Sequence, residues 1–224
     1  MSTYVYGITH ADRRLPEDIE GVGDPPRPVR AVRSGDLMAL CSDVPAGRKP
    51  KPRDLLAHQR VVLRAGTDGP VVPLPFGEVS PDDDTVAAVL DERHDRYVEC
   101  LKSLDGKDEF HVEVHHDEEA ARQAVLADDE EVTPRTLVDR ARSDAALVEE
   151  QLAAHAASVR YGPGARRVRP AEPAFVADLS FLVERDGQDD FLAAVRRLHL
   201  EHEHLLVQAT GPLPPYSFGP ATRD

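Results

Sequence analysis

Short stretches in which apolar side chains occupy every second position recur along this chain, separated by stretches with helical spacing. The clearest covers residues 175–183, where Phe175, Leu179 and Val183 belong to one alternating set. Alternation with a period of two is typical of strands, whereas apolar residues at intervals of three and four are typical of amphipathic helices. Strands interleaved with helices in this way favour an α+β fold.

The patterns of the first 80 residues predict mainly strands. We expect strands at residues 3–9, 29–33 and 37–43, a helix at 53–65, and an edge strand running into a bend at 70–77. Ser34-Gly35-Asp36 suits a hairpin turn between the second and third strands. The proline-rich segment between the first two strands is expected to hold little regular structure. The apolar stripe of the helix, interrupted by Gln59, comprises Leu55, Leu56, Val62 and Leu63.

The remainder of the chain predicts longer helices. One helix is expected from the acidic tract at 82–84 to residue 104, and another from Thr133 to the Gly-Pro-Gly at 162–164, packed on the first through an apolar seam. Further elements are expected at 110–116 (strand), 117–126 (helix), 166–169 (loop or edge strand), 175–183 (strand), 189–200 (helix) and 205–209 (strand). This order resembles two modified ferredoxin-like units, the second enlarged by a long helix.

The charge of the chain, −14 overall, is unevenly distributed. Residues 1–80 carry 11 Lys and Arg against 10 Asp and Glu, so they are nearly neutral and the net negative charge lies in residues 81–224. This step predicts an N-terminal α+β domain at 1–80 and a C-terminal α+β domain with long helices at 81–224. The alternative is that long exposed helices simply cluster in the second half.

The composition also restricts the partners and the cellular compartment that we expect for this chain. An acidic balance disfavours nucleic acid or an anionic membrane as a partner, because both attract clustered positive charge. The two cysteines, Cys41 and Cys100, are too few for a disulfide scaffold and favour a reducing compartment. The sequence has neither a signal-peptide pattern nor an apolar run of membrane-spanning length, so we expect a soluble cytoplasmic protein.

Residues that carry chemistry are sparse. The histidines form two groups, His199, His202, His204 and His111, His115, His116, which we expect to be solvated surface residues because a metal site needs converging ligands. The acidic runs at 82–84 and 128–131 lack calcium-loop spacing and fit a helix start and an exposed linker. No nucleophile or phosphate-binding motif surrounds either cysteine or occurs elsewhere. We therefore predict no catalytic, cofactor-binding or metal-binding residues, and no enzyme.

Three aromatic residues in proline-rich segments remain as candidates. Tyr216 and Phe218 lie in the closing segment GPLPPYSF, and Phe76 lies in PLPFG. Prolines hold such segments extended, and aromatic rings contribute large contact area at little entropic cost. These residues are expected either to anchor the chain on the sheet or to form part of a partner-binding surface.

Several segments together resemble the gas vesicle protein F/L family. They are YVYGI at 4–8, LLAHQRVVL around His58, VPLPFG at 72–77, LKSLDGKDEFHVEV at 101–114 and GPLPPYSF at 211–218. The chain departs from the usual family pattern at Pro75, where Arg is common, and at Leu213, where Trp is common.

The resemblance implies a non-enzymatic accessory or minor component of gas vesicles, without cofactors. Its implied partners are the hydrophobic shell protein and other vesicle accessory proteins, and its implied location is the cytoplasm and the gas vesicle. A soluble acidic protein could cover the apolar surface of a shell subunit before assembly. The alternative function is a small-molecule-binding regulatory protein with paired ferredoxin-like domains, and a metal-dependent enzyme is a third.

Overall fold

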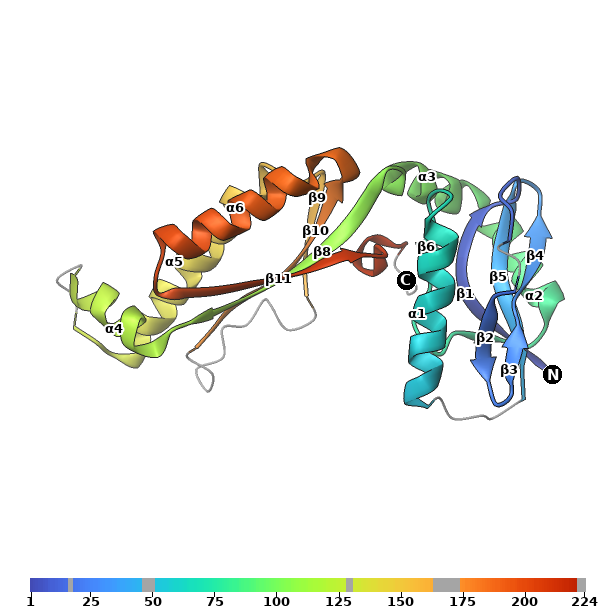
Figure 1. Ribbon diagram of the computed structural model, residues 1–224, viewed down its shortest axis with the longest axis horizontal. Helices are drawn as coiled ribbons and strands as arrows, with labels where there is room; N and C mark the ends of the chain where they lie inside the picture. The colour runs from blue at the N-terminus through green and yellow to red at the C-terminus, as the bar shows by residue number, and fades with distance from the viewer. Residues whose placement is uncertain (16–17, 46–50, 128–130, 163–173, 221–224) are drawn as a thin grey trace. The chain divides into compact units, whose positions relative to one another are not determined.

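The computed structural model describes residues 1–15, 18–45, 51–127, 131–162 and 174–220 (Figure 1). The chain forms two compact units, Met1–Gly106 with Pro214–Asp224 (unit 1) and Lys107–Leu213 (unit 2). The segment predicted at 166–169 and most of the acidic run at 128–131 lie outside the described residues.

Unit 1 is built on an antiparallel sheet with the order β4-β5-β1-β6, in which β7 also pairs with β1. Its strands are β1 (Ser2–His10), β4 (Arg30–Ser34), β5 (Leu37–Val44), β6 (Val72–Pro73) and β7 (Val79–Ser80). The predicted β4–β5 hairpin is confirmed, with Ser34 paired to Leu37 across the turn. Helix α1 (Pro52–Gly66) connects β5 to β6.

The connection from β1 to β4 is what makes unit 1 a modified ferredoxin-like fold. In the βαββαβ arrangement a helix leads from the first strand to the second. Here a small hairpin of β2 (Glu20–Gly23) and β3 (Pro26–Pro28) takes that place and packs beside α1 (Figure 1). The expectation of little regular structure in this proline-rich segment was therefore wrong. The Val22 N–H donates to the Tyr6 hydroxyl at 2.7 Å, which ties the hairpin to the sheet.

The buried face of α1 differs from the predicted stripe. Ala57, His58, Val61 and Val62 face the core, whereas Leu55, Leu56 and Leu63 are 39%, 63% and 50% exposed. Residues 54, 58, 61 and 65 are spaced by four, three and four, so they share one side of the helix. The sequence contains two apolar stripes, and the sheet buries the one that includes a histidine.

The other face of the unit 1 sheet is covered by two helices, α2 (Asp83–Glu92) and α3 (His94–Leu104). One continuous helix was expected, but the backbone leaves helical geometry at Arg93, where α2, which packs on β4 and β5, gives way to α3, which packs on β6. Asp82 caps α2 by accepting from the Thr85 N–H at 2.8 Å. Because both helices pack on this sheet, the predicted boundary at residue 80 lies inside unit 1.

A bulge in β1 decides which of its side chains face which helices. The register with β5 shifts between Val5 and Gly7. Tyr4 and Tyr6 therefore belong to the core beneath α1, whereas Ile8 lies with Val5 on the side of α2. Strict alternation along the predicted strand would place Ile8 with the two tyrosines, and the bulge reverses that alternation.

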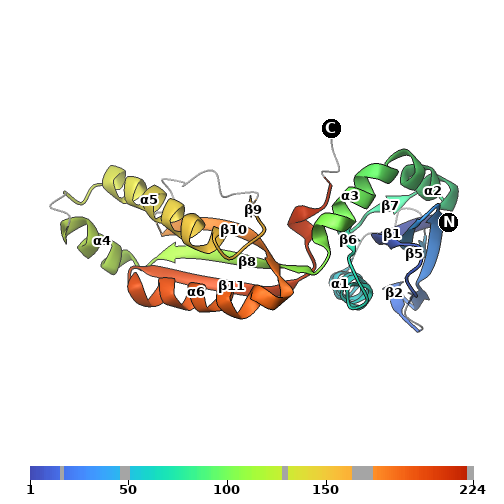
Figure 2. The same cartoon turned by 90° about the horizontal axis from the view of Figure 1, so that it is seen from above.

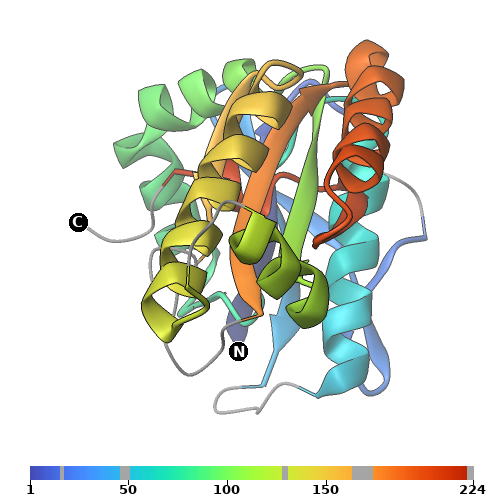
Figure 3. The same cartoon turned by 90° about the vertical axis from the view of Figure 1, so that its left-hand side faces the viewer.

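Unit 2 has the ferredoxin-like strand order, β11-β8-β10-β9, with all neighbours antiparallel. Its elements are β8 (Lys107–His116), α4 (Glu118–Ala127), α5 (Pro134–Ala153), β9 (Ser158–Tyr161), β10 (Phe175–Glu184), α6 (Gln188–Glu201) and β11 (Leu205–Leu213). Helices α5 and α6 lie side by side on one face of the sheet (Figures 2 and 3). The long-helix extension expected in the second unit corresponds to helices α4 and α5, which together connect β8 to β9.

Helix α5 is shorter than predicted and packs elsewhere. It ends at Ala153, and residues expected to continue it form β9, which pairs with β10. The predicted seam of Ala141, Val148 and Leu152 packs against β10 and α6 in the core of unit 2. The helix begins where the sequence predicted, and Thr133 caps it by accepting from the Thr136 N–H. The apolar periodicity did not predict where the helix ends.

Candidate functional site

Four aromatic rings surround the imidazole of His58 in unit 1. The ring centroids of Tyr6, Tyr4, Phe76 and Tyr216 lie 5.6, 5.8, 5.8 and 6.0 Å from that of His58. His58 is 1% exposed, whereas Tyr216 is 36% exposed. The rings come from β1, from the loop after β6, and from the closing segment, so α1 presents His58 to three distant parts of the chain. We call these five residues the aromatic cluster.

Burial determines the protonation state of the cluster. It lowers the pKa of His58 to about 4, an effect that outweighs the opposing influence of the Leu74 backbone. The imidazole is therefore neutral at pH 7, and its Nδ1 lies 3.0 Å from the Tyr4 hydroxyl oxygen. That oxygen also accepts from the Gly77 N–H at 2.9 Å. Burial raises the pKa of Tyr216 to about 12. The cluster is thus uncharged at pH 7, and one hydrogen bond joins two of its members, His58 and Tyr4.

The three aromatic residues predicted as candidates do not all lie together in the structure. Phe76 and Tyr216 both belong to the aromatic cluster, but Phe218 does not. Phe218 is 9% exposed, and its carbonyl oxygen lies 3.6 Å from the Cys100 Sγ on α3. Phe218 therefore anchors the closing segment to unit 1, while Tyr216 leaves part of its ring in solvent.

The outer face of α1 carries three leucines and no acidic residue, beside the exposed polar residues Arg53, Gln59, Arg60 and Arg64. Leu55, Leu56 and Leu63 account for three of the ten exposed large apolar side chains among the described residues. The only acidic residue of α1 is Asp54, which is 3% exposed and accepts from the Lys51 N–H at the helix start. These leucines are thus an exposed apolar group with no carboxylate beside them on the helix, in a chain of net charge −14. We call these three residues the leucine face.

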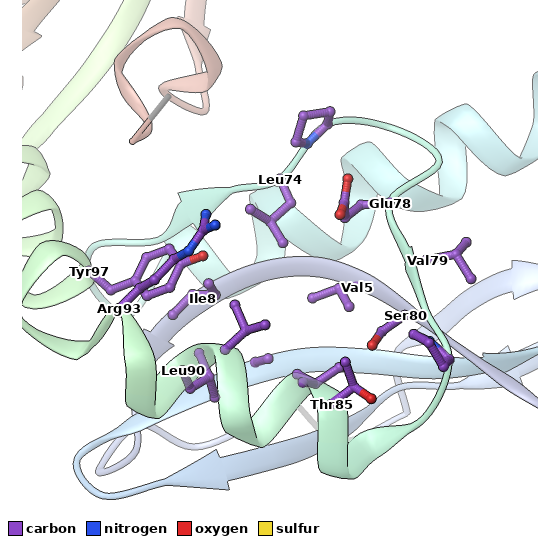
Figure 4. Close-up of a pocket in the computed structure, with 15 residues that line it drawn as sticks. Val5, Ile8, Leu74, Glu78, Val79, Ser80, Thr85, Leu90, Arg93 and Tyr97 are labelled. Atoms are coloured by element: carbon purple, nitrogen blue, oxygen red, sulfur yellow. The ribbon is translucent and has the colours of Figure 1, made fainter. Parts of the chain in front are cut away.

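Unit 1 also contains a hollow of about 680 Å³ between the sheet and α2 (Figure 4). Its floor is apolar and buried, and consists of Val5, Ile8, Ala39, Leu74, Val86, Leu90 and Tyr97. Glu78, Thr85 and Arg93 lie at its rim. An apolar floor with a few polar groups at the mouth is typical of small-molecule sites.

Unit 2 buries two of the histidines that were expected on the surface. His116 and His204 are 4% and 8% exposed and both meet Asp144 of α5, whose carboxylate is also held by Arg140. Hydrogen bonds from the two histidines and the nearby positive charge of Arg140 lower the pKa of Asp144 against the effect of burial. The prediction of solvated histidines fails here because strand ends can be buried under a crossing helix.

The described cysteines lack the character of nucleophiles. Burial raises the pKa of Cys41 to about 12 and that of Cys100 to about 11. Reactive cysteines have lowered pKa values and exist as thiolates at neutral pH. In the described part of the chain, no helix is both long enough and apolar enough to cross a membrane.

Comparison with known proteins gives the family of this chain. The family model described as gas vesicle synthesis protein GvpL/GvpF matches residues 2–137 and 133–220. The chain is a member of the GvpL/GvpF family. It is 46% identical to gas vesicle protein F of Streptomyces sp. (strain CB03234), over 97% of this chain and 99% of that protein. It is 31% identical to gas vesicle protein L of the same strain, over 96% and 91%.

Solved structures of this family share the fold. The crystal structure of gas vesicle protein GvpF from Anabaena sp. PCC7120 superposes with a TM-score of 0.81 at 21% identity, covering 99% of this chain and 97% of that one. GvpF from Microcystis aeruginosa gives a TM-score of 0.75 at 18% identity, with coverage of 97% and 98%. Four of the five segments on which the family resemblance rests supply residues of the aromatic cluster.

Proposed function

We propose that this protein is a non-enzymatic accessory or minor component of gas vesicles that binds the hydrophobic shell protein and assists its assembly. Membership of the GvpL/GvpF family supports a gas vesicle role. The observation that carries the more specific proposal is the leucine face of α1, an exposed apolar surface without a carboxylate. We place the protein in the cytoplasm and at the vesicle, with the shell protein and other vesicle accessory proteins as its partners.

The leucine face suits this task on energetic grounds. Burial of an exposed leucine side chain contributes about 1.5–3 kcal/mol. Leu56 and Leu63 are each at least half exposed, so covering both contributes about 2 kcal/mol, or a factor of about 30 in affinity. The acidic remainder of the chain keeps the complex dispersed, because like charges repel neighbouring complexes.

The aromatic cluster supports the leucine face from beneath. His58 lies on the buried side of the same helix, and the rings around it fix the position of α1 on the sheet. A rigid helix presents its apolar residues to a partner with little further loss of entropy. We therefore assign Phe76 and Tyr216 a positioning role, with the exposed edge of Tyr216 available for contact.

Co-expression with the shell protein, followed by affinity purification of the full-length chain in moderate salt, tests the proposal. We expect the shell protein to be retained, and Leu56→Glu with Leu63→Glu to reduce retention by at least about tenfold. The matched control is Leu126→Glu with Leu200→Glu in unit 2, at positions 51% and 76% exposed, which should leave retention unchanged. Equal losses from both double variants, or no retention by the wild type, would contradict the proposal.

The hollow beneath α2 supports the second candidate function, binding of a small molecule by a regulatory protein. Its volume of about 680 Å³ lies in the range of ligand sites. Val89→Trp would fill it from the helix side and abolish any rise in melting temperature produced by a metabolite panel. A panel that shifts the melting temperature of neither the wild type nor the variant excludes this function for the compounds tested.

A further inference from the structure

Three buried side chains of unit 2 direct polar atoms toward one point. His116 ends β8, Asp144 lies in α5, and His204 directly precedes β11. Their side chains are 2%, 5% and 9% exposed. One potential ligand atom from each lies within 4.8 Å of the other two. Three separate elements thus bring two imidazoles and a carboxylate together away from solvent.

The distances within this group are close to those of a metal site. Asp144 Oδ2 lies 2.8 Å from His116 Nε2 and 3.2 Å from His204 Nε2. With bonds of about 2.0–2.2 Å, neighbouring ligands of tetrahedral zinc lie about 3.3 Å apart. Two of the three ligand pairs are therefore within about half an ångström of the spacing that a tetrahedral ion requires. Imidazole nitrogen and carboxylate oxygen are ligands that zinc and its neighbours in the first transition row accept.

Arg140 holds the cation position in this structure. Its Nε lies 3.2 Å from both carboxylate oxygens of Asp144, and its Nη2 lies 3.2 Å from His204 Nε2. The guanidinium and a divalent ion repel each other and cannot both occupy this buried space. The Arg140 side chain is 23% exposed, so it is the most exposed of the four.

We propose that His116, Asp144 and His204 bind one divalent transition-metal ion of the zinc class, and that Arg140 leaves the cluster when the ion enters. The ion and the guanidinium compete for the same carboxylate, so Arg140 weakens metal binding. Occupancy by the ion links α5 to both β8 and β11 through coordinate bonds. This site is separate from the leucine face, so the proposed function neither requires it nor depends on it.

Titration of the purified full-length chain with Co²⁺ and Zn²⁺ tests the site. Co²⁺ should bind at one ion per chain with the visible absorption bands of a tetrahedral complex, and Zn²⁺ should displace it. Asp144→Asn should abolish the bands. Arg140→Gln should tighten binding by at least about tenfold, because the competing cation is gone. A purely structural hydrogen-bond network would give no cobalt spectrum and no gain in affinity from the Arg140 substitution.

Two further variants distinguish binding at this site from binding by surface histidines. His111→Asn with His115→Asn removes surface histidines that pair with Asp178 and Glu113, and should leave the titration unchanged. If Asp144→Asn fails to fold by circular dichroism, His204→Asn replaces it, with the same expected loss. Absence of stoichiometric Co²⁺ binding in both the wild type and Arg140→Gln, or binding that is lost only with His111 and His115, would overturn the proposal.

Discussion

Acidification from pH 7 to pH 4 should destabilise unit 1 through His58. The unfolded chain carries this imidazole with a pKa near its ordinary value of 6.5, whereas burial lowers the pKa to about 4 in the folded state. Each tenfold difference in proton affinity corresponds to about 1.4 kcal/mol. The difference between the two states therefore amounts to about 3 kcal/mol, which needs no reduction for solvent screening because His58 is 1% exposed.

The direction of this pH effect on stability follows from which state, folded or unfolded, binds the proton of His58 more tightly. Above pH 6.5 the imidazole is neutral in both states, and the full stability is present. As the pH falls below 6.5, the unfolded state takes up a proton first, so the free energy of unfolding decreases until about pH 4. The aromatic cluster has no place for an imidazolium, since its rings leave no carboxylate beside His58 Nδ1, which instead meets the Tyr4 hydroxyl.

Urea denaturation followed by tyrosine fluorescence measures this effect. Four of the five tyrosines (Tyr4, Tyr6, Tyr97 and Tyr216) belong to unit 1, and the chain has no tryptophan, so the signal reports mainly on that unit. His58→Asn keeps an acceptor near the position of Nδ1 but does not titrate. The difference between wild type and variant should change by about 3 kcal/mol from pH 7 to pH 4. Parallel pH profiles, or a His58 pKa near 6.5 by NMR, would refute the reasoning.

Three further predictions concern the stability of unit 1, each measured by urea denaturation at pH 7. Tyr4→Phe removes the hydroxyl that the Gly77 N–H donates to and should cost about 1–3 kcal/mol. Leu101→Ala, at a position 0% exposed, should cost about 2–5 kcal/mol, whereas Leu56→Ala on the leucine face should change stability by less than about 0.5 kcal/mol. Asp82→Ala removes the cap of α2 and should cost about 1 kcal/mol. A similar cost for Leu56→Ala and Leu101→Ala would contradict the burial assigned to α1 and α3.

Local patterns predicted the elements whose stabilising contacts are themselves local. The β4–β5 hairpin follows from its turn residues, and β10 follows from its alternation. The ferredoxin-like order of unit 2 was also accessible, because the succession of strands and helices restricts it. The bulge in β1 could not be predicted from the local pattern, since it depends on how β1 pairs with β5 and how Ile8 packs toward α2.

Features that depend on packing escaped the sequence patterns. Of the four leucine and valine positions predicted as the buried stripe of α1, only Val62 is buried, and the core instead contains the side of the helix that carries His58. The charge step at residue 80 misplaced the domain boundary, because charge reports what solvent sees and not which sheet a helix covers. His116 and His204 lie 88 positions apart, and only α5 crossing the sheet brings them to one carboxylate.

The candidate residues also show that contacts between distant segments cannot be predicted from local sequence patterns. Phe76 and Tyr216 stood out because prolines hold their segments extended and large rings contribute contact area at little entropic cost. Their shared neighbour, His58, lies in a different segment from either, and no spacing rule connects the three. The family resemblance named these segments, but only the fold explains that they meet around one buried imidazole.

Site-specific photo-crosslinking tests the central claim, that the leucine face of α1 binds the shell protein, most directly. A photoreactive residue at position 56 of the full-length chain, co-expressed with the shell protein and irradiated, should give a crosslinked product with that protein. The same residue at position 200, which is also exposed but lies in unit 2, should give none. A product from position 200 alone, or a complex that forms without any crosslink at position 56, would contradict the account.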